Sequence, residues 1–414
     1  MALAGTETGT TGSSWRTPAL VIACGALIGM LTFGPRSTFG VFLQPMSHDL
    51  GWGRDVFAVA LAVQNLLWGL GQPFAGAMSD RFGTLRVMAV GGLLYAAGLV
   101  LMRYAASPLM LTMSTGVLIG FGLSGASFNL VLAAFTKLVP PAQRSLALGI
   151  GTAAGSFGQF LFAPFSAAMI DAVGWQSTLM VFAALMLLVV PLSLVVATPS
   201  AAHPSASAEP HQPIHHALAE AFGHRSYVLL VLGFFTCGFQ LAFITAHLPA
   251  YLVDRGLTVQ AGGWVLAVIG LFNIVGSISV GWFANYFPRR YVLSTIYLAR
   301  ALSIVIFISF PVTTGSAIAF AVVTGLTWLS TVPPTSSLIA LMFGTRWLAT
   351  LYGFAFVSHQ IGGFLGALLG GIAFDRFGSY GIIWWLSALL GLLSALINLP
   401  IVEEPVARIA PQAS

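Results

Sequence analysis

The sequence predicts an all-α membrane protein in which twelve transmembrane helices form two pseudo-symmetric six-helix bundles. Three observations predict this fold class: a composition suited to lipid, twelve long apolar runs, and a repeat that relates the two halves. Of the 414 residues, 57% are hydrophobic and only 7% are charged, whereas soluble domains carry about 25% charged residues. This composition excludes an ordinary soluble enzyme, a disordered chain and a nucleic-acid-binding protein, and it makes the lipid bilayer the main partner of the surface.

Twelve apolar runs are long enough to cross a membrane, which takes about 20 predominantly apolar residues as a helix. The runs are unbroken and lack the alternation over about 10 residues that is typical of a transmembrane β-strand. The predicted spans are 17–44, 55–78, 87–105, 109–136, 145–170, 176–197, 226–252, 261–284, 292–312, 316–342, 349–373 and 382–402.

The polar segments divide the chain. The N-terminal segment lacks the basic start and cleavable apolar core of a secretory signal, and the stretch after the sixth run is rich in Pro, Ala, Ser and His, as flexible linkers are. Histidines in this stretch are irregularly spaced and predict no metal site. The predicted organisation is a disordered tail (1–16), a first six-helix bundle (17–197), a cytoplasmic linker (198–225), a second six-helix bundle (226–402) and a C-terminal tail (403–414).

The distribution of basic residues predicts the orientation. Ten of the 16 lysines and arginines fall on the side of the termini, four on the opposite side and two within spans. Because positive residues accumulate on the cytoplasmic side, we expect a multi-pass protein of the cytoplasmic (inner) membrane with both termini in the cytoplasm.

The two halves resemble each other at an offset of about 204 residues. Gly76-Ala-Met-Ser-Asp80 matches Gly281-Trp-Phe-Ala-Asn285, and Asp171-Ala-Val-Gly174 matches Asp375-Arg-Phe-Gly378. Chance matching in glycine-rich apolar sequence is the alternative. Duplication predicts two six-helix halves related by an axis along the membrane normal, as in many secondary transporters.

The segment Gly76-x-x-x-Asp80-Arg81-Phe82-Gly83-x-x-Arg86 resembles the loop motif of the major facilitator superfamily. The resemblance implies a gating role, in which the acid and the arginines tie the loop to neighbouring helix ends and stabilise the outward-open state. A carboxylate can cap a helix N-terminus and pair with a guanidinium. The gating residues expected here are Asp80, Arg81, Gly83 and Arg86; ordinary positive-inside charge is the alternative. Asn285 replaces the acid in the second copy.

Two arginines lie within spans, whereas all eleven acidic residues lie in loops, tails or span ends. Ionisable residues inside a membrane are costly and usually functional, and a guanidinium stays protonated. The excess of positive charge predicts an anionic substrate, most simply a carboxylate, which accepts two parallel hydrogen bonds from arginine. Arg36, which follows Pro35, is the main candidate, with snorkelling to the interface as its alternative. Arg300 is a candidate second anion or coupling site, although a structural role is favoured.

Five polar residues near span centres complete the predicted site, because transporter sites lie near the bilayer midplane. The amides can orient an anion, or they can join helices by hydrogen bonds. His359 titrates near physiological pH and is expected to sense or carry charge unless it packs as a neutral ring. The set is Gln64, Asn65, Gln240, Asn273 and His359.

Two further features are candidates for gating or coupling. His247 lies further out on the seventh span, where a gate, a coupling role or simple packing are all open. Pro333 and Pro334 interrupt the tenth span. Proline removes a backbone donor and kinks a helix, so this pair is expected to form a hinge of the inner gate, or a packing irregularity.

A second resemblance narrows the substrate. Phe33-Gly34-Pro35-Arg36-Ser37-x-Phe39-Gly40-Val41-Phe42 looks like the first span of the monocarboxylate transporters, and Arg144-x-Leu146-Ala147-x-Gly149 with Ala163-Pro164 looks like their fifth-span signature. The resemblance implies transport of short monocarboxylates such as lactate or pyruvate, usually with a proton. However, Asn273 and Ser277 stand where that family carries an Asp and an Arg. His359 lies in the region where oxalate/formate exchangers carry a basic residue.

The sequence therefore predicts a secondary active transporter that moves a small organic anion by alternating access. It is expected to act as a monomer, without a cofactor, and any coupled proton would ride on His359 or on the substrate. The alternatives are an oxalate/formate-type exchanger and a proton-coupled drug exporter, although the fourth span lacks the arginine typical of the latter. No span holds His-Glu-x-x-His, Gly-x-Ser-x-Gly or paired acids, so an enzyme is not expected.

Overall fold

The computed structural model describes residues 16–198, 214–284, 286–344 and 347–406. The predicted N-terminal tail before Arg16, most of the linker and most of the C-terminal tail lie outside these residues. The described chain is helical and contains no strand. Its first half comprises α1 (Pro18–Ser37), α2 (Phe39–Leu50), α3 (Arg54–Phe82), α4 (Thr84–Arg103), α5 (Pro108–Leu111), the π-helix η1 (Thr112–Leu118), α6 (Ile119–Gly125), α7 (Phe128–Leu138), α8 (Pro141–Leu187) and α9 (Val189–Val195).

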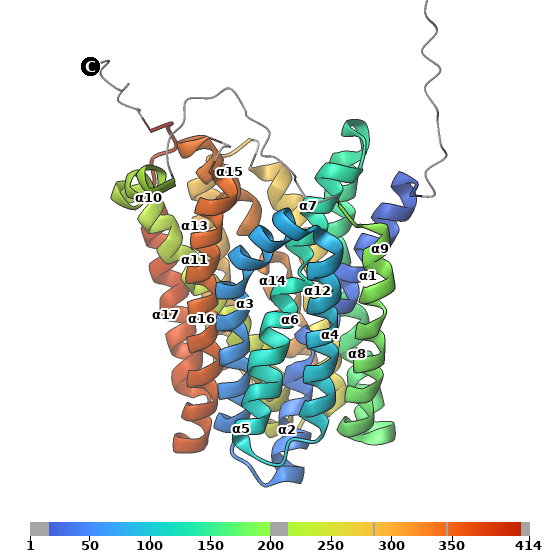
Figure 1. Cartoon of the computed structure of the whole chain (residues 1–414). Helices are drawn as coiled ribbons and strands as arrows, with labels where there is room; N and C mark the ends of the chain where they lie inside the picture. The colour runs from blue at the N-terminus through green and yellow to red at the C-terminus, as the bar shows by residue number, and fades with distance from the viewer. Residues whose placement is uncertain (1–15, 199–213, 285, 345–346, 407–414) are drawn as a thin grey trace, which may run out of the picture.

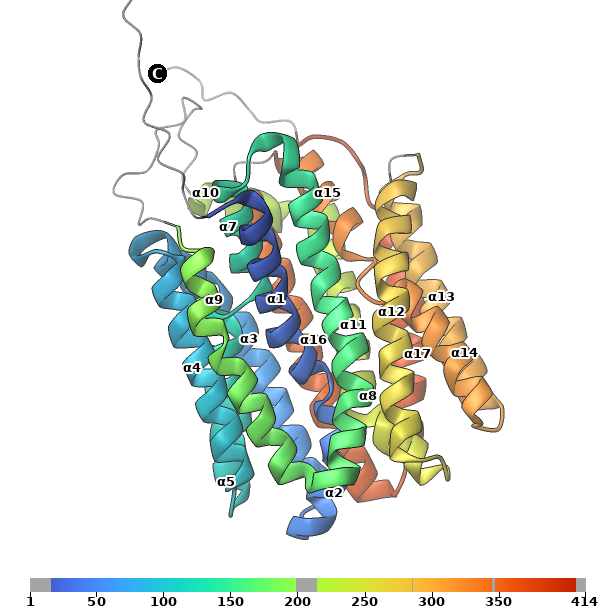
Figure 2. The same ribbon diagram turned by 90° about the vertical axis from the view of Figure 1, so that its right-hand side faces the viewer.

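The second half follows a short helix, α10 (Ile214–Gly223). Its helices are α11 (Arg225–Asp254), α12 (Val259–Phe283), α13 (Arg289–Ser309), α14 (Thr314–Thr327), α15 (Val332–Phe343), α16 (Leu348–Phe377) and α17 (Gly381–Asn398). Figures 1 and 2 show the long helices of both halves with their axes roughly along one direction.

The predicted fold class of twelve membrane-crossing helices is confirmed. Eleven helical stretches of the described chain are long and apolar enough to cross a membrane, and one of them, Leu146–Val195, is 50 residues long. Gly174 interrupts its helical geometry with φ 80° and ψ 162°, a conformation that in practice only glycine adopts. The chain turns back there, as the lower part of α8 in Figure 2 shows, so this stretch provides the fifth and the sixth span.

Three of the predicted spans are not single continuous α-helices. The first is divided at Thr38 into α1 and α2, the fourth contains the π-helix η1, and the tenth is divided into α14 and α15. Apolar periodicity sets where a chain crosses a membrane, but it does not show where a helix is broken inside the protein.

The bundle has two ends. The terminal face is the end at which α1 begins. Val406, near the end of the described chain, also lies at this face, where its backbone N–H donates to the carbonyl of Met342. The distal face is the opposite end and carries the turns 51–53 and 378–380. Figure 2 shows the ribbons of α8 and α12 close together at mid-depth and diverging toward the terminal face.

Two helix pairs join the halves, α3 with α16 and α8 with α12. Small residues allow the backbones to approach closely: a Cβ added at Gly371 of α16 would overlap the Cβ of Ala58, and one added at Gly270 of α12 would lie 2.8 Å from the carbonyl oxygen of Ser156. A third contact runs between α2 and α11, where a Cβ at Gly40 would overlap the carbonyl oxygen of Thr245. These contacts lie at mid-depth or toward the distal face.

We predict that Gly174→Ala lowers the free energy of unfolding by about 1–3 kcal/mol, because an alanine is strained in this backbone conformation. The matched control is Gly149→Ala in the same helix. Gly149 is exposed and a Cβ there meets nothing within 4 Å, so alanine should leave stability unchanged or raise it by up to about 1 kcal/mol. Thermal melting of the purified proteins measures both effects, and equal melting temperatures would contradict the role of Gly174.

Candidate substrate-binding site and gates

Arg36 lies at the end of α1, where α1 gives way to α2. Its guanidinium donates to Oδ1 of Asn65 on α3 and lies 4.8 Å from the ring centroid of Trp68 and 6.0 Å from that of Phe33. Aromatic faces attract cations but carry no net charge. Among the described residues, no carboxylate pairs with Arg36, so its local partners are one amide and two ring faces.

The space beside Arg36 is narrow in this conformation. A pocket between α1, α2, α3 and α11 is lined by Arg36, Gln64 and Asn65 from the first half and by Ala242, Thr245 and Ala246 from the second. Its volume is about 10 Å³, which suits roughly one water molecule. A larger molecule can reach the guanidinium from this pocket only if the halves separate or if the Asn65 side chain moves.

The three predicted residues of the first half therefore lie together. Gln64 lines the pocket, and its amide also donates to the carbonyl of Thr115 at 2.9 Å. The amide nitrogen of Asn65 donates to the carbonyl of Leu61 at 2.9 Å, and its amide oxygen accepts a hydrogen bond from the Arg36 guanidinium. Both amides are positioned by α3, whose backbone at Asn65 also receives a hydrogen bond from the second half.

That hydrogen bond comes from Gln360 on α16, whose Nε2 donates to the carbonyl of Asn65 at 3.2 Å. The Oε1 atom of Gln360 lies 3.0 Å from Nδ1 of His359. His359 is 9% exposed and stacks on Phe356, with ring centroids 5.7 Å apart. Gln360 thus connects His359 to the surroundings of Arg36 across the two halves.

Sequence reasoning missed Gln360 and Trp68, although the position of each in the sequence could have marked it as part of the site. Gln360 is a mid-span amide adjacent to His359. Trp68 follows Asn65 by three residues and so shares its helix face; its ring packs edge-on against Phe356 with centroids 5.6 Å apart.

Arg300 has different partners from Arg36. It is 2% exposed, and its guanidinium donates to the carbonyl of Thr327, to the carbonyl of Trp328 at 2.6 Å and to Oε1 of Gln240 at 3.3 Å. These carbonyls terminate α14, and a cation at a helix C-terminus is stabilising. Protein oxygens therefore compensate Arg300 within the second half, which supports the structural role.

Gln240 and Asn273 are also held by protein groups. Gln240 donates to the carbonyl of Ser387 at 2.9 Å in addition to receiving Arg300. Asn273 donates to Oγ of Ser156 in α8 at 2.7 Å, and its Oδ1 accepts the backbone N–H of Leu329 at 2.9 Å. Asn273 thus ties the break between α14 and α15 to the other half of the protein.

The tenth span is interrupted as predicted, but the break precedes the two prolines. The break covers 328–331, and Pro333 and Pro334 lie in the first turn of α15. Proline is tolerated there because the first N–H groups of a helix have no intrahelical acceptor. The carbonyls of Thr327 and Trp328, which the break leaves without helical N–H donors, accept hydrogen bonds from the Arg300 guanidinium.

His247 is fully buried in α11 and packs between aromatic rings. Its Nε2 lies 2.7 Å from the carbonyl oxygen of Ala367, and the centroids of Phe243 and Tyr380 lie 5.7 and 5.2 Å away. This environment fits the packing alternative for His247.

The predicted gate motif lies at the terminal face, between α3 and α4. Gly83 has φ 84° and ψ 151° and separates the two helices, which explains the need for glycine. Arg81 lies 5.2 Å from the ring centroid of Phe82, and Arg86 is exposed at the edge of an apolar groove formed by α3, α4 and α6. The side chain of Asp80 lies outside the described residues, so its predicted contact stays a prediction.

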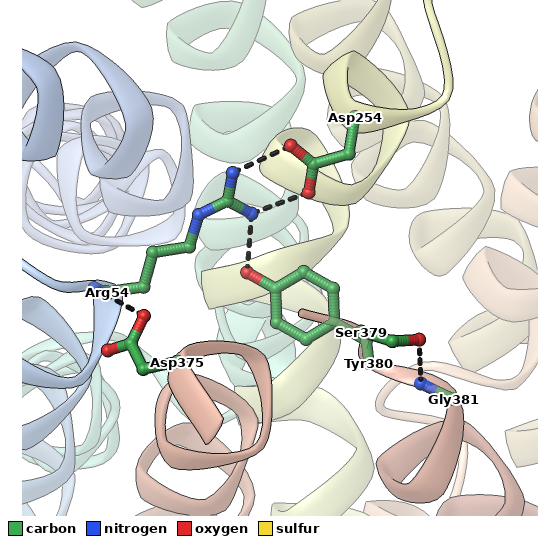
Figure 3. A network of polar contacts seen from close by, with 6 residues as sticks. All are labelled: Arg54, Asp254, Asp375, Ser379, Tyr380 and Gly381. Carbon is green, nitrogen blue, oxygen red and sulfur yellow. Dashed lines mark hydrogen bonds and ion pairs between the residues drawn. The ribbon is translucent and has the colours of Figure 1, made fainter. Parts of the chain in front are cut away.

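The distal face carries a charged network between the halves that sequence reasoning did not single out (Figure 3). Arg54 at the start of α3 binds both carboxylate oxygens of Asp254 at 2.6 and 2.7 Å and donates to the hydroxyl of Tyr380 at 2.9 Å. Burial raises the pKa of the Tyr380 phenol above its ordinary value, so the hydroxyl stays neutral. The guanidinium also lies 3.7 Å from the ring centroid of Phe374.

A second carboxylate completes the network. Asp375 of α16 accepts the backbone N–H groups of Arg54 at 3.1 Å and of Asp55 at 2.6 Å. Charged residues at span ends are common, so nothing in the sequence pattern joined Arg54, Asp254 and Asp375. The network holds the two halves together at the distal face.

The twelve-span architecture, the two-half arrangement and a polar centre between the halves define a membrane transporter. The profile of the Major Facilitator Superfamily matches residues 25–367 and 263–414, and the chain belongs to this superfamily, whose members are transporters and not enzymes.

Individual proteins agree with this assignment. The chain is 28% identical over 389 residues to the uncharacterized MFS-type transporter YcxA of Bacillus subtilis (strain 168), covering 92% of this chain and 94% of that protein. It is 28% identical over 359 residues to monocarboxylate transporter 13 of Rattus norvegicus, covering 84% and 81%. Among solved structures, a D-xylose-proton symporter has a TM-score of 0.74 at 14% identity, covering 93% of this chain and 98% of that one.

The fold also resembles a bacterial homolog of the human lysosomal transporter Spinster, described as inward-facing and unoccupied. The TM-score is 0.69 at 16% identity, covering 93% of this chain and 95% of that one. Similarity at this level of identity concerns the fold alone.

We predict that Arg300→Met destabilises the protein more than Arg36→Met. The first change leaves two carbonyls and an amide oxygen without their donor, and each buried unsatisfied group costs about 1–3 kcal/mol; the second leaves only the Asn65 oxygen. Thermal melting of the two purified variants in one detergent makes the comparison. An equal or larger loss for Arg36→Met would contradict the different roles of the two arginines.

Proposed function

We propose that this transporter moves a small organic anion, most simply a monocarboxylate such as lactate or pyruvate, across the cytoplasmic membrane by alternating access. The observation that carries the proposal is Arg36, a permanent cation at the junction of the two halves whose partners are neutral. A substrate carboxylate is the natural counter-ion for such a group, because its two oxygens match the guanidinium fork. The similarity to proteins named monocarboxylate transporters supports the same substrate class.

We further infer that the terminal face is cytoplasmic and that the distal face is external, because most basic residues outside the spans lie toward the termini. The halves are then 17–197 and 226–402, joined by a cytoplasmic linker over 198–225. With the charged network closing the distal face and α8 and α12 diverging toward the terminal face, this conformation corresponds to the one that loads or releases substrate on the cytoplasmic side.

In this mechanism the carboxylate binds Arg36 by displacing the oxygen of Asn65. The Asn65 amide, Gln64 and the Trp68 ring then form the walls of the site. Because the carbonyl of Asn65 is bonded to Gln360 of the other half, movement of α3 on substrate binding reaches α16 directly. Gln240 and Asn273 support the second half, and His359, adjacent to Gln360, senses or carries the charge of a coupled proton.

Uptake of labelled lactate, pyruvate, oxalate and formate into proteoliposomes, with and without a pH gradient, tests the substrate class. Uptake of lactate or pyruvate is expected. Oxalate or formate exchange without gradient-driven uptake of the other two would identify the exchanger alternative, and no anion transport under any condition would contradict the proposal.

Arg36→Ala should reduce uptake by about 30-fold or more, because losing one partner of a buried charge pair costs about 2–5 kcal/mol of binding. Arg36→Lys keeps the charge but not the planar fork and should retain partial activity with a raised KM. Uptake rates measured on equal amounts of folded protein decide the point, and wild-type uptake by Arg36→Ala would remove Arg36 from the site.

His359→Gln should separate coupling from transport. A glutamine can still hydrogen-bond to Gln360 but cannot titrate near neutral pH, so counterflow of labelled substrate should persist while accumulation driven by a pH gradient is lost. Gradient-driven accumulation at the wild-type level would exclude His359 as the proton carrier and leave the proton on the substrate.

A further inference from the structure

The helices α3 and α16 end in the same four residues. The C-terminal sequences are Asp80-Arg81-Phe82-Gly83 for α3 and Asp375-Arg376-Phe377-Gly378 for α16, and both glycines have positive φ, 84° and 65°. The two helices pack side by side in opposite directions: Arg54 begins α3 next to Asp375 near the end of α16, and Gly69 lies against Gln360 at mid-depth. Each Asp-Arg-Phe-Gly end therefore belongs to the same face of the protein as the beginning of the other helix.

The beginning of α3 depends on the other half for its cap. The first N–H groups of a helix need acceptors outside the helix, and α3 follows Gly53, which has no side chain to supply one. Asp375 supplies both acceptors, one oxygen to the N–H of Arg54 and the other to the N–H of Asp55. A carboxylate at this position also opposes the positive end of the helix dipole.

The two helix pairs that join the halves, α3–α16 and α8–α12, form two seams between them. In the described part of the chain, the α8–α12 seam lacks a helix cap supplied by the opposite half. By the internal repeat, Asp171 of α8 corresponds to Asp375, and α12 corresponds to α3. Asp171 is exposed and forms no hydrogen bond or ion pair with the residues that the structure describes. The helix α12 is capped by its own Thr258, which accepts from the N–H of Ala261 at 3.2 Å. Capping from the opposite half is thus a property of the α3–α16 pair.

We infer that Asp375 is a gating residue, which caps α3 across the two halves only while the distal face is closed. The inference rests on the alternating access proposed above but not on the identity of the substrate. When the distal face opens, α3 and α16 separate there and the cap is lost. The loop motif predicts that Asp80 ties α3 to a neighbouring helix end at the terminal face. If that helix is α16, the two Asp-Arg-Phe-Gly ends hold opposite conformations.

A single cysteine at Ala250 reports the opening of the distal face. Ala250 is 1% exposed and belongs to α11 of the second half, but it packs within the apolar core of the first half. The native Cys24 and Cys237 are replaced by serine, and Ala250→Cys is labelled with a polar maleimide in the full-length protein in lipid nanodiscs. Both faces are accessible in a nanodisc, so the labelling rate depends on the conformation and not on the orientation.

Asp375→Ala should raise the labelling rate by about fivefold, the change in equilibrium that corresponds to the loss of one helix cap. Asp375→Asn keeps one of the two acceptor oxygens and should give an intermediate rate. Asp171→Ala, the matched control on the other seam, should label like the parent protein. A parent-like rate for Asp375→Ala, or an equal increase for Asp171→Ala, would overturn the inference.

The double variant Asp80→Ala/Asp375→Ala separates gating from loss of fold. If the two caps oppose each other, the rate should return toward that of the parent protein. A rate that stays at or above the Asp375→Ala level would indicate general loosening and would contradict the inference. Because labelling requires no substrate, this experiment tests the gating role of Asp375 even if the protein transports none of the anions tested.

Discussion

The structure depends on the cost of holding a guanidinium inside a membrane. Arginine does not lose its proton there, and an ionised group away from water requires compensation. Arg300 receives it from the carbonyls of Thr327 and Trp328, which are available because the tenth span is broken. Arg36 has an amide oxygen and two ring faces. The same residue type is thus held by backbone carbonyls in one half and by neutral groups alone in the other, where we propose that it binds an anion. The difference lies in the number of oxygens that the protein provides.

The helix α3 connects this charge to both ends of the protein. Its middle turns carry Gln64, Asn65 and Trp68 around Arg36, its first residue holds the charged network of the distal face, and its last turn leads into the motif at the terminal face. A helix moves largely as a rigid body, so a displacement at Asn65 is felt at Arg54. The partner helix α16 contacts α3 through Gln360 at mid-depth and Asp375 at the distal face, and in the proposed mechanism the displacement reaches α16 through these contacts.

The sequence was sufficient to predict the fold and to select part of the candidate site. Apolar run length predicted the twelve crossings, because lipid imposes one strong requirement on every span, and the absence of acids in the spans pointed to Arg36. The partners of each polar residue could not be predicted, because they depend on how helices rotate against one another. Asn273, for example, reaches Ser156 in a different half and Leu329 in a helix break. The distal network was missed for a related reason: Arg54, Asp254 and Asp375 are ordinary span-end charges until the fold brings them together.

The two seams between the halves use different chemistry, and this difference bears on how the halves can move. The α8–α12 seam joins small residues and neutral amides, such as Gly270 against Ser156 and the hydrogen bond from Gln159 to the carbonyl of Leu266 at 3.1 Å. Such contacts are short-ranged and can be exchanged by small rotations. At the distal end of the α3–α16 seam, Asp375 caps α3, and Arg54 of α3 also forms a bidentate ion pair with Asp254 at the end of α11. These interactions are either formed or broken. A protein with one adaptable seam and one two-state seam has the mechanical elements of a hinge and a latch, and the ion pair of Arg54 with Asp254 belongs to the latch.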